Sequence, residues 1–99
     1  MALEVIFHPE AEKEYLDACN WYESEVPGLG QRFKNAVLKQ IARILQNPEL
    51  YPAKERNYRE SITEVFPYVI VYKIGKNSDT LNIVAIYHAS RKPSRKYRR

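Results

Sequence analysis

The sequence predicts one α+β domain in which a helical hairpin packs on one face of an antiparallel sheet. Its length of 99 residues suits a single core, so we expect residues 1–99 to form one domain. Apolar residues recur with helical spacing in the first half of the chain and with strand spacing in the second half. The expected order of elements is therefore strand, helix, helix, strand, strand, strand, with the last three strands forming a meander.

A short strand and a first helix are predicted at the start of the chain. Residues 3–7 are rich in β-forming side chains and are followed by His8-Pro9. Pro9 suits the first position of a helix because its missing N–H needs no partner there, and we expect His8 to cap this helix. The apolar stripe of the helix contains Ala11, Tyr15, Ala18 and Tyr22, widened by Leu16 and Cys19.

A second helix is predicted between a break at residues 26–30 and the pair Asn47-Pro48. The break, Val-Pro-Gly-Leu-Gly, contains a proline and two glycines that interrupt the helical pattern. Both helices have one apolar and one charged face, so the hairpin needs a sheet to cover its apolar surface. The apolar stripe of the second helix contains Phe33, Val37, Ile41, Ile44 and Leu45.

Three strands are predicted in the second half of the chain. Residues 58–66 predict an edge strand, on which Ile62 and Phe66 share a face with two glutamates. Residues 68–72 are apolar on both faces, as expected for a central strand, and a turn at residues 75–79 leads into residues 80–87. In this last strand we expect one face to carry Leu81, Ile83, Ala85 and Tyr87.

Positive charge is concentrated at the C-terminal end. Residues 1–50 contain five Lys/Arg and eight Asp/Glu, a net charge of −3. Residues 51–99 contain eleven Lys/Arg and four Asp/Glu, a net charge of +7, which gives +4 for the whole chain. This end suits a polyanion or an acidic partner, although a solvated tail that only aids solubility is an alternative. The cations after residue 88 are Arg91, Lys92, Arg95, Lys96, Arg98 and Arg99.

The remaining composition argues for a cytoplasmic protein without a membrane partner. The single cysteine, Cys19, excludes an intramolecular disulfide and a cysteine-based zinc site. We interpret it as a small buried apolar residue rather than a reactive thiol. The chain has no apolar run of about 18 residues and no apolar leader.

A series of short motifs stands in a fixed order along nearly the whole chain. They are Pro9-Glu10-Ala11, Trp21-Tyr22, Pro27-Gly28-Leu29-Gly30, Arg32-Phe33, Asn47-Pro48, Arg59 ahead of Phe66-Pro67-Tyr68, Tyr72, and His88-x-x-Arg91-x-Pro93. Together with the element order, they resemble the RelE/ParE superfamily of toxins, in particular the branch labelled plasmid stabilisation protein. The resemblance implies the toxin of a type II toxin–antitoxin pair, neutralised by direct binding of an antitoxin protein.

The resemblance leaves the target open, because some members cleave mRNA on the ribosome and others bind DNA gyrase without nuclease activity. Cleavage by a 2′-hydroxyl needs a base, an acid and cations at the phosphate, but no metal, so we expect no metal or cofactor. On this hypothesis His88 is the acid or base, Arg59 and Arg91 clamp the phosphate, and Tyr97 assists. The residues expected to bind nucleic acid or target are Lys54, Arg56, Lys92, Arg95, Lys96, Arg98 and Arg99.

Each candidate also has a purely structural interpretation. A histidine after a strand can cap a turn, and Arg59 can pair with Glu60 or Glu64. The central strands and their turn offer only Lys73 and Lys76 as cations, fewer than the ribosome-dependent nucleases use, which favours a gyrase-binding or other non-nuclease toxin. A non-catalytic basic RNA-binding or protein-interaction module remains a further alternative.

Overall fold

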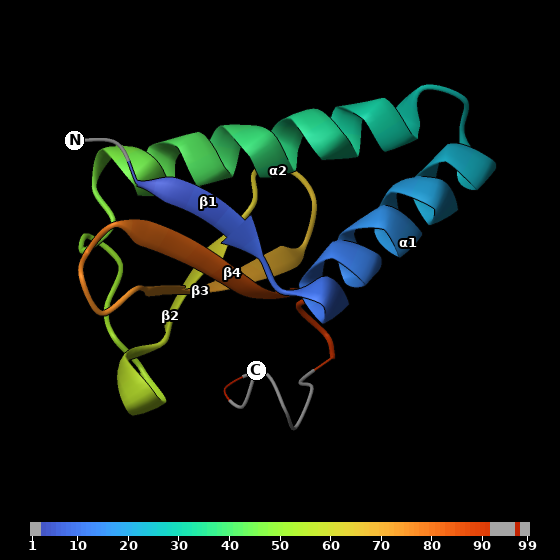
Figure 1. Ribbon diagram of the computed structural model, residues 1–99. Coiled ribbons are helices and arrows are strands. Elements are labelled where there is room, and N and C mark those ends of the chain that lie inside the picture. The colour runs from blue at the N-terminus through green and yellow to red at the C-terminus, as the bar shows by residue number, and fades with distance from the viewer. Residues whose placement is uncertain (1–2, 92–96, 98–99) are drawn as a thin grey trace.

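The protein folds as a helical hairpin on a four-stranded sheet, which confirms the predicted α+β class (Figure 1). The computed structural model describes residues 3–91 and 97. Strands follow the order β1-β4-β3-β2, with β1 parallel to β4 and the other pairs antiparallel. The elements are β1 (Glu4–Phe7), α1 (Pro9–Glu25), α2 (Leu29–Gln46), the 3-10 helix η1 (Glu55–Asn57), β2 (Arg59–Ile62), β3 (Tyr68–Ile74) and β4 (Thr80–His88).

Helix α1 begins as the sequence predicts. The Nδ1 atom of His8 accepts a hydrogen bond from the backbone N–H of Glu10 at 3.1 Å, so His8 caps the helix at Pro9. Ala11 and Ala18 are buried against the sheet, whereas the side chain of Leu16 is 50% exposed. The expectation that Leu16 widens the buried stripe was therefore wrong, because Leu16 lies beside that narrow stripe, on the solvent side of the helix.

The turn between the helices depends on Glu23 and two glycines. The carboxylate of Glu23 accepts hydrogen bonds from the N–H groups of Gly28 and Gly30, at 2.9 and 3.0 Å, and so satisfies the start of α2. Gly28 has a φ of +88°, a conformation that favours glycine. A Cβ atom on Gly30 would lie 2.6 Å from the carbonyl oxygen of Cys19, so the two helices approach closely at this point.

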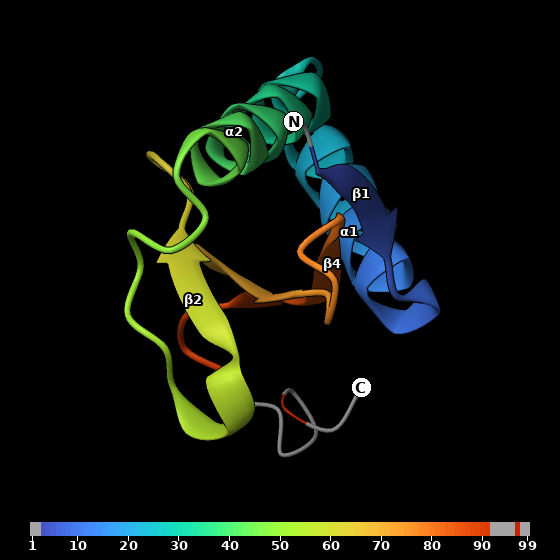
Figure 2. The same ribbon diagram turned by 60° about the vertical axis from the view of Figure 1, so that its left-hand side comes forward.

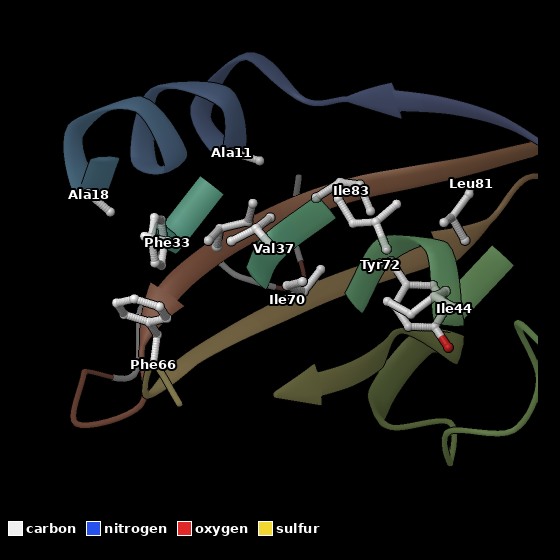
Figure 3. Close-up of a cluster of buried hydrophobic side chains, with 12 residues drawn as sticks. Ala11, Ala18, Phe33, Val37, Ile44, Phe66, Ile70, Tyr72, Leu81 and Ile83 are labelled. Carbon is white, nitrogen blue, oxygen red and sulfur yellow. The ribbon is translucent and has the colours of Figure 1, made fainter. Parts of the chain in front are cut away.

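The main core lies between the hairpin and the sheet. Figure 3 shows side chains of both helices pointing toward those of β3 and β4. Its largest fully buried members include Phe33, Ile44, Tyr72 and Leu81. A second, smaller cluster lies on the opposite face of the sheet, which we call the open face because the helices do not cover it (Figure 2). Its buried members are Tyr58, Val69, Val71, Val84, Ala85 and Tyr87.

A β-bulge in β4 divides the strand between these two clusters. Tyr72 pairs with Ile83 but Val71 pairs with Ala85, so Val84 is an extra residue on β4. The alternation of side chains therefore shifts by one residue after Ile83. Ala85 and Tyr87 lie on the open face rather than beside Leu81 and Ile83, and the prediction that these four residues share a face was wrong.

Strand β2 is an edge strand, as predicted, but it ends at Ile62 rather than Phe66. The Thr63 hydroxyl donates a hydrogen bond to the Phe66 carbonyl oxygen at 2.6 Å, which closes the chain into a turn instead of a longer strand. Ile62 is 61% exposed and Phe66 only 7% exposed, so these two side chains do not share a face. Among the described helices, none is long and apolar enough to cross a membrane.

The close approach at Gly30 predicts that Gly30→Ala lowers the free energy of unfolding by about 1–2 kcal/mol. Overpacking costs about 1–3 kcal/mol, and the better helix propensity of alanine offsets up to about 1 kcal/mol of this. Urea denaturation measures the change, with Gln31→Ala at the exposed neighbouring position as a control that changes by less than about 0.5 kcal/mol. An increase in stability for Gly30→Ala would contradict the packing described here.

Buried tyrosines predict a loss of stability at alkaline pH. Burial raises the pKa of Tyr72 to about 12, above the value of about 10 expected in the unfolded chain. The folded state therefore holds more protons than the unfolded state between these values, so the free energy of unfolding falls as the pH rises through this range. Denaturation curves measured from pH 9 to 12 should show that the free energy of unfolding falls less steeply with pH for Tyr72→Phe than for the wild type. Equal slopes for the two proteins would refute the raised pKa of Tyr72.

Candidate functional site

The sheet places the candidate residues at three separate locations. His88 and Arg91 lie at the C-terminal end of β4, Arg59 lies at the start of β2, and Tyr97 lies against the open face. His88 pairs with Tyr68 on β3, whereas Arg59 pairs with Tyr72. These two partners lie four residues apart on β3, so His88 and Arg59 are separated by about 13 Å along the strand, at roughly 3.3 Å per residue.

His88 forms a local turn at the end of β4. Its Nδ1 atom accepts a hydrogen bond from the Ser90 N–H at 3.1 Å and lies 2.8 Å from the Ser90 hydroxyl oxygen. Its ring contacts the ring of Tyr68 edge to face, with 5.4 Å between the ring centres. Burial raises the pKa of Tyr68, and the positive charge of Arg91 partly offsets this shift. His88, Tyr68 and Arg91 are therefore neighbours.

The guanidinium group of Arg59 holds the loop that follows α2. It donates hydrogen bonds to the carbonyl oxygens of Glu49, at 3.3 Å, and of Tyr51. The Tyr72 hydroxyl donates to the Pro48 carbonyl oxygen of the same loop at 2.6 Å. Because the side chain of Arg59 serves these backbone oxygens, it points into the loop rather than toward His88.

Tyr97 packs on the open face beside a second tyrosine. Its ring stacks on that of Tyr58, with the ring centres 5.2 Å apart, and its hydroxyl donates a hydrogen bond to the Glu60 carboxylate. The ammonium group of Lys73 lies 4.9 Å from the centre of the Tyr58 ring, within the range of a cation–π contact. Together these side chains join the second cluster on the opposite face from Arg59.

The cations expected to bind a target are only partly described. Lys54 and Arg56 are exposed in the segment before β2, and Lys54 lines a hollow of about 550 Å³ between α2 and β2. Lys92, Arg95, Lys96, Arg98 and Arg99 lie outside the described residues. No group of three or more possible metal ligands occurs within residues 3–91.

Cys19 has the environment of a structural cysteine. It is half-buried against the main core, beside Tyr15. Burial raises the pKa of its thiol, so the neutral form is favoured at neutral pH. The neighbouring Tyr15 hydroxyl also has its pKa raised by burial, to about 12.

A basic face of α2 was missed by the sequence analysis. Arg32, Lys39 and Arg43 stand at positions i, i+7 and i+11, a spacing that places them on one side of a helix. Arg43 and Lys39 form salt bridges with Glu64, with nitrogen–oxygen distances of 2.5 and 3.6 Å. The spacing could have been recognised from the sequence, but the contact with Glu64 depends on the turn after β2.

A buried polar network supports the same side of the molecule. The side-chain amide of Gln40 on α2 donates hydrogen bonds to the Tyr51 hydroxyl at 2.9 Å and to the Ser61 hydroxyl at 2.5 Å. Gln40 and Ser61 are both buried. The network therefore joins α2, the following loop and β2, and it fixes the position of the basic face relative to the sheet.

Solved structures of toxins share this fold. The chain aligns with a structure described as the chromosomal ParDE toxin–antitoxin system from P. aeruginosa, at a TM-score of 0.74 and 12% identity, covering 88% of this chain and 96% of that one. It also aligns with a mutant of the E. coli toxin RelE in the free state, at a TM-score of 0.65 and 18% identity, covering 99% and 93%. These likenesses define the fold as that of the RelE/ParE-like toxins.

Sequence comparison adds the family. A family model described as "ParE toxin of type II toxin-antitoxin system, parDE" matches residues 5–93, whereas no curated protein compared with the chain matches it. The chain therefore belongs to the ParE toxin family and is a toxin of a type II toxin–antitoxin system. The relative from P. aeruginosa is described as chromosomal, so a role in plasmid stabilisation stays a prediction.

The hydrogen bonds of Arg59 predict a structural effect of its removal. Arg59→Ala should lower the free energy of unfolding by about 1.5–3 kcal/mol, the range for a hydrogen bond to a charged group, and Arg59→Lys should restore part of it. Urea denaturation measures both, with Arg56→Ala at an exposed position as the control. Full stability of Arg59→Ala together with lost toxicity would instead support a phosphate-binding role.

Proposed function

We propose that this toxin inhibits growth by binding DNA gyrase rather than by cutting mRNA, and that an antitoxin protein neutralises it by direct binding. The observation that carries this proposal is the separation of Arg59 and Tyr97 from the neighbouring pair His88 and Arg91. A ribonuclease needs a base, an acid and a phosphate-binding cation within hydrogen-bond reach of one phosphodiester. His88 and Arg59 lie about 13 Å apart along β3, at about 3.3 Å per residue, and Tyr97 packs on the other face of the sheet.

The contacts of these side chains support the same conclusion. The guanidinium of Arg59 is occupied by two carbonyl oxygens, and the Nδ1 atom of His88 is occupied by Ser90. His88 therefore caps a turn, as its structural interpretation predicted, whereas Arg59 holds loop carbonyl oxygens instead of pairing with Glu60 or Glu64, so that structural interpretation was wrong. A toxin that acts by binding needs only a complementary surface, and these contacts do not hinder such a role.

Membership of the ParE family supports gyrase as the target. Some members of the RelE/ParE superfamily bind gyrase and have no nuclease activity, and the matching family model is named for ParE. The antitoxin partner is supported by a structure of mutant E. coli RelE in complex with an antitoxin RelBc peptide, which aligns at a TM-score of 0.67, with 16% identity and 99% and 93% coverage. An acidic antitoxin segment would suit the basic charge of this chain.

The proposal predicts that the purified protein inhibits DNA supercoiling by gyrase and leaves mRNA intact in a purified translation system. His88→Ala should leave this inhibition unchanged, because binding does not require proton transfer. Parallel assays of supercoiling and of mRNA cleavage make the measurement. His8→Ala serves as the matched control, since it also removes one histidine but does so at the cap of α1.

Cleavage of mRNA in these assays would contradict the binding mechanism. A nuclease would cut mRNA only during translation, and His88→Ala would reduce that rate by about 10²–10⁴, the usual contribution of a general acid or base. Such a loss, with His8→Ala unaffected, would refute the binding mechanism. Cleavage that persists in His88→Ala would also refute it and would exclude His88 from the chemistry.

A further inference from the structure

The turn between β2 and β3 holds an exposed apolar residue in a strained conformation. Val65 has a φ of +70°, a value that β-branched residues rarely adopt, and its side chain is 87% exposed. The Phe66 N–H donates to the Glu64 carbonyl oxygen at 2.7 Å, so Val65 is the central residue of a three-residue γ-turn. A γ-turn with a positive central φ is rare and strained.

Contacts on both sides of Val65 impose this conformation. Phe66 is anchored in the core, where its ring centre lies 5.3 Å from that of Phe33. The Thr63 hydroxyl holds the Phe66 carbonyl oxygen, and Glu64 is held by Arg43 and Lys39 on α2. Strain that the surrounding structure maintains at an exposed position is typical of functional sites rather than of simple turns.

A hollow beside Val65 combines apolar and basic walls. It has a volume of about 290 Å³ and is lined on the α2 side by Arg32, Asn35, Ala36 and Lys39. The turn residues Glu64, Val65 and Phe66 form the opposite wall. An apolar side chain that entered it would contact Ala36, Phe66 and the exposed Val65.

A second hollow continues the surface on the other side of Glu64. This is the hollow of about 550 Å³ between α2 and β2, and Arg43, Lys54 and the exposed Ile62 are among its lining residues. From Arg32 to Arg43 the surface extends about 16 Å along α2, at 1.5 Å per residue, which matches three turns of a helix. We call this region the α2–turn surface, defined by Arg32, Lys39, Arg43, Lys54, Glu64 and Val65.

Charge on the α2–turn surface is unbalanced in favour of the cations. Its four cations stand against two carboxylates that line the hollows, those of Glu64 and Glu60, and the Glu60 carboxylate already accepts a hydrogen bond from the Tyr97 hydroxyl. Among the described residues, Arg32 and Lys54 form no salt bridge. The hydrogen bond and the charge of Arg43, with the charge of Lys39, lower the pKa of Glu64, so this carboxylate stays ionised. Glu64 thus occupies the position that a partner's carboxylate would take.

We propose that the α2–turn surface binds an acidic amphipathic helix of the antitoxin, whose apolar residues enter the hollow beside Val65 and whose carboxylates pair with the cations of α2 and with Lys54. This inference rests on the proposed neutralisation by an antitoxin. A protein helix fits better than nucleic acid, because Phe66, the aromatic residue that lines the hollow beside Val65, is only 7% exposed and packs on Phe33, which leaves little of its ring for base stacking, and because Glu64 would repel phosphates. A partner carboxylate competes with Glu64 for Arg43 and Lys39.

This competition predicts opposite effects of two kinds of substitution. The probe is the product of the reading frame beside this gene, and titration calorimetry measures its affinity for the purified toxin. Arg32→Glu combined with Lys39→Glu should weaken binding at least 10-fold and flatten its dependence on salt, because two attractive charges become repulsive. Glu64→Gln should strengthen binding several-fold, because it removes the competing carboxylate.

The control is Lys34→Glu, a single charge reversal on α2 at a residue that lines neither hollow; it is compared with Arg32→Glu and Lys39→Glu made singly, and it should bind like the wild type. Thermal unfolding confirms that each variant is folded, and the milder pair Arg32→Gln and Lys39→Gln replaces the charge reversals if these fail to fold. In cells, the weakened variants should remain toxic and escape rescue by the probe.

The outcomes separate this inference from the proposed function. Equal affinity for the wild type and every variant, with binding intact, would overturn the α2–turn surface alone. Absence of binding to the wild type would overturn the antitoxin partner and this surface together. Variants that lose toxicity but keep the wild-type affinity for the probe would show that the surface binds the target. If the wild type bound a single-stranded RNA and the same variants did not, the surface would bind nucleic acid. Either result would refute the proposal.

Discussion

The arrangement of the whole domain depends on the hydrogen bonding of β4. This strand is buried on both faces, but β1 pairs with it only as far as Ile83. Beyond that point α1 supplies the missing partner, since the Glu14 carboxylate accepts a hydrogen bond from the Ile86 N–H at 3.1 Å. Buried backbone groups need such partners, so the position of α1, and with it the hairpin, follows from the unpaired edge of β4.

The bulge at Val84 determines which face each later residue of β4 occupies. It turns Ala85 and Tyr87 to the open face and leaves His88 beside Tyr68, on the side of the helices. Strand β4 therefore contributes buried apolar residues to both clusters. The same shift separates His88 from the ring of Tyr97, which explains why residues close in sequence do not form one site.

This toxin shares its fold with structures that have few of its residues. The structures that it resembles share only 12–18% of its sequence, a level at which the fold persists while exposed residues diverge. In this chain Arg59 holds the loop that follows α2, and Gln40 connects α2 with β2 through hydrogen bonds. The cations left on the outside of α2 then lie beside the strained turn at Val65, where charge and apolar contact are both available to a partner.

Local structure could be predicted from the sequence alone. Pro9 begins α1, Gly28 and Gly30 form the turn, and apolar spacing defines both helices and the meander. These features were predictable because capping, turn formation and periodicity act within a few residues. The parallel pairing of β1 with β4, the bulge at Val84 and the separation of Arg59, His88 and Tyr97 became visible only in the folded chain. These depend on contacts between distant segments, where the pairing of backbone groups and the packing of both sheet faces override local alternation.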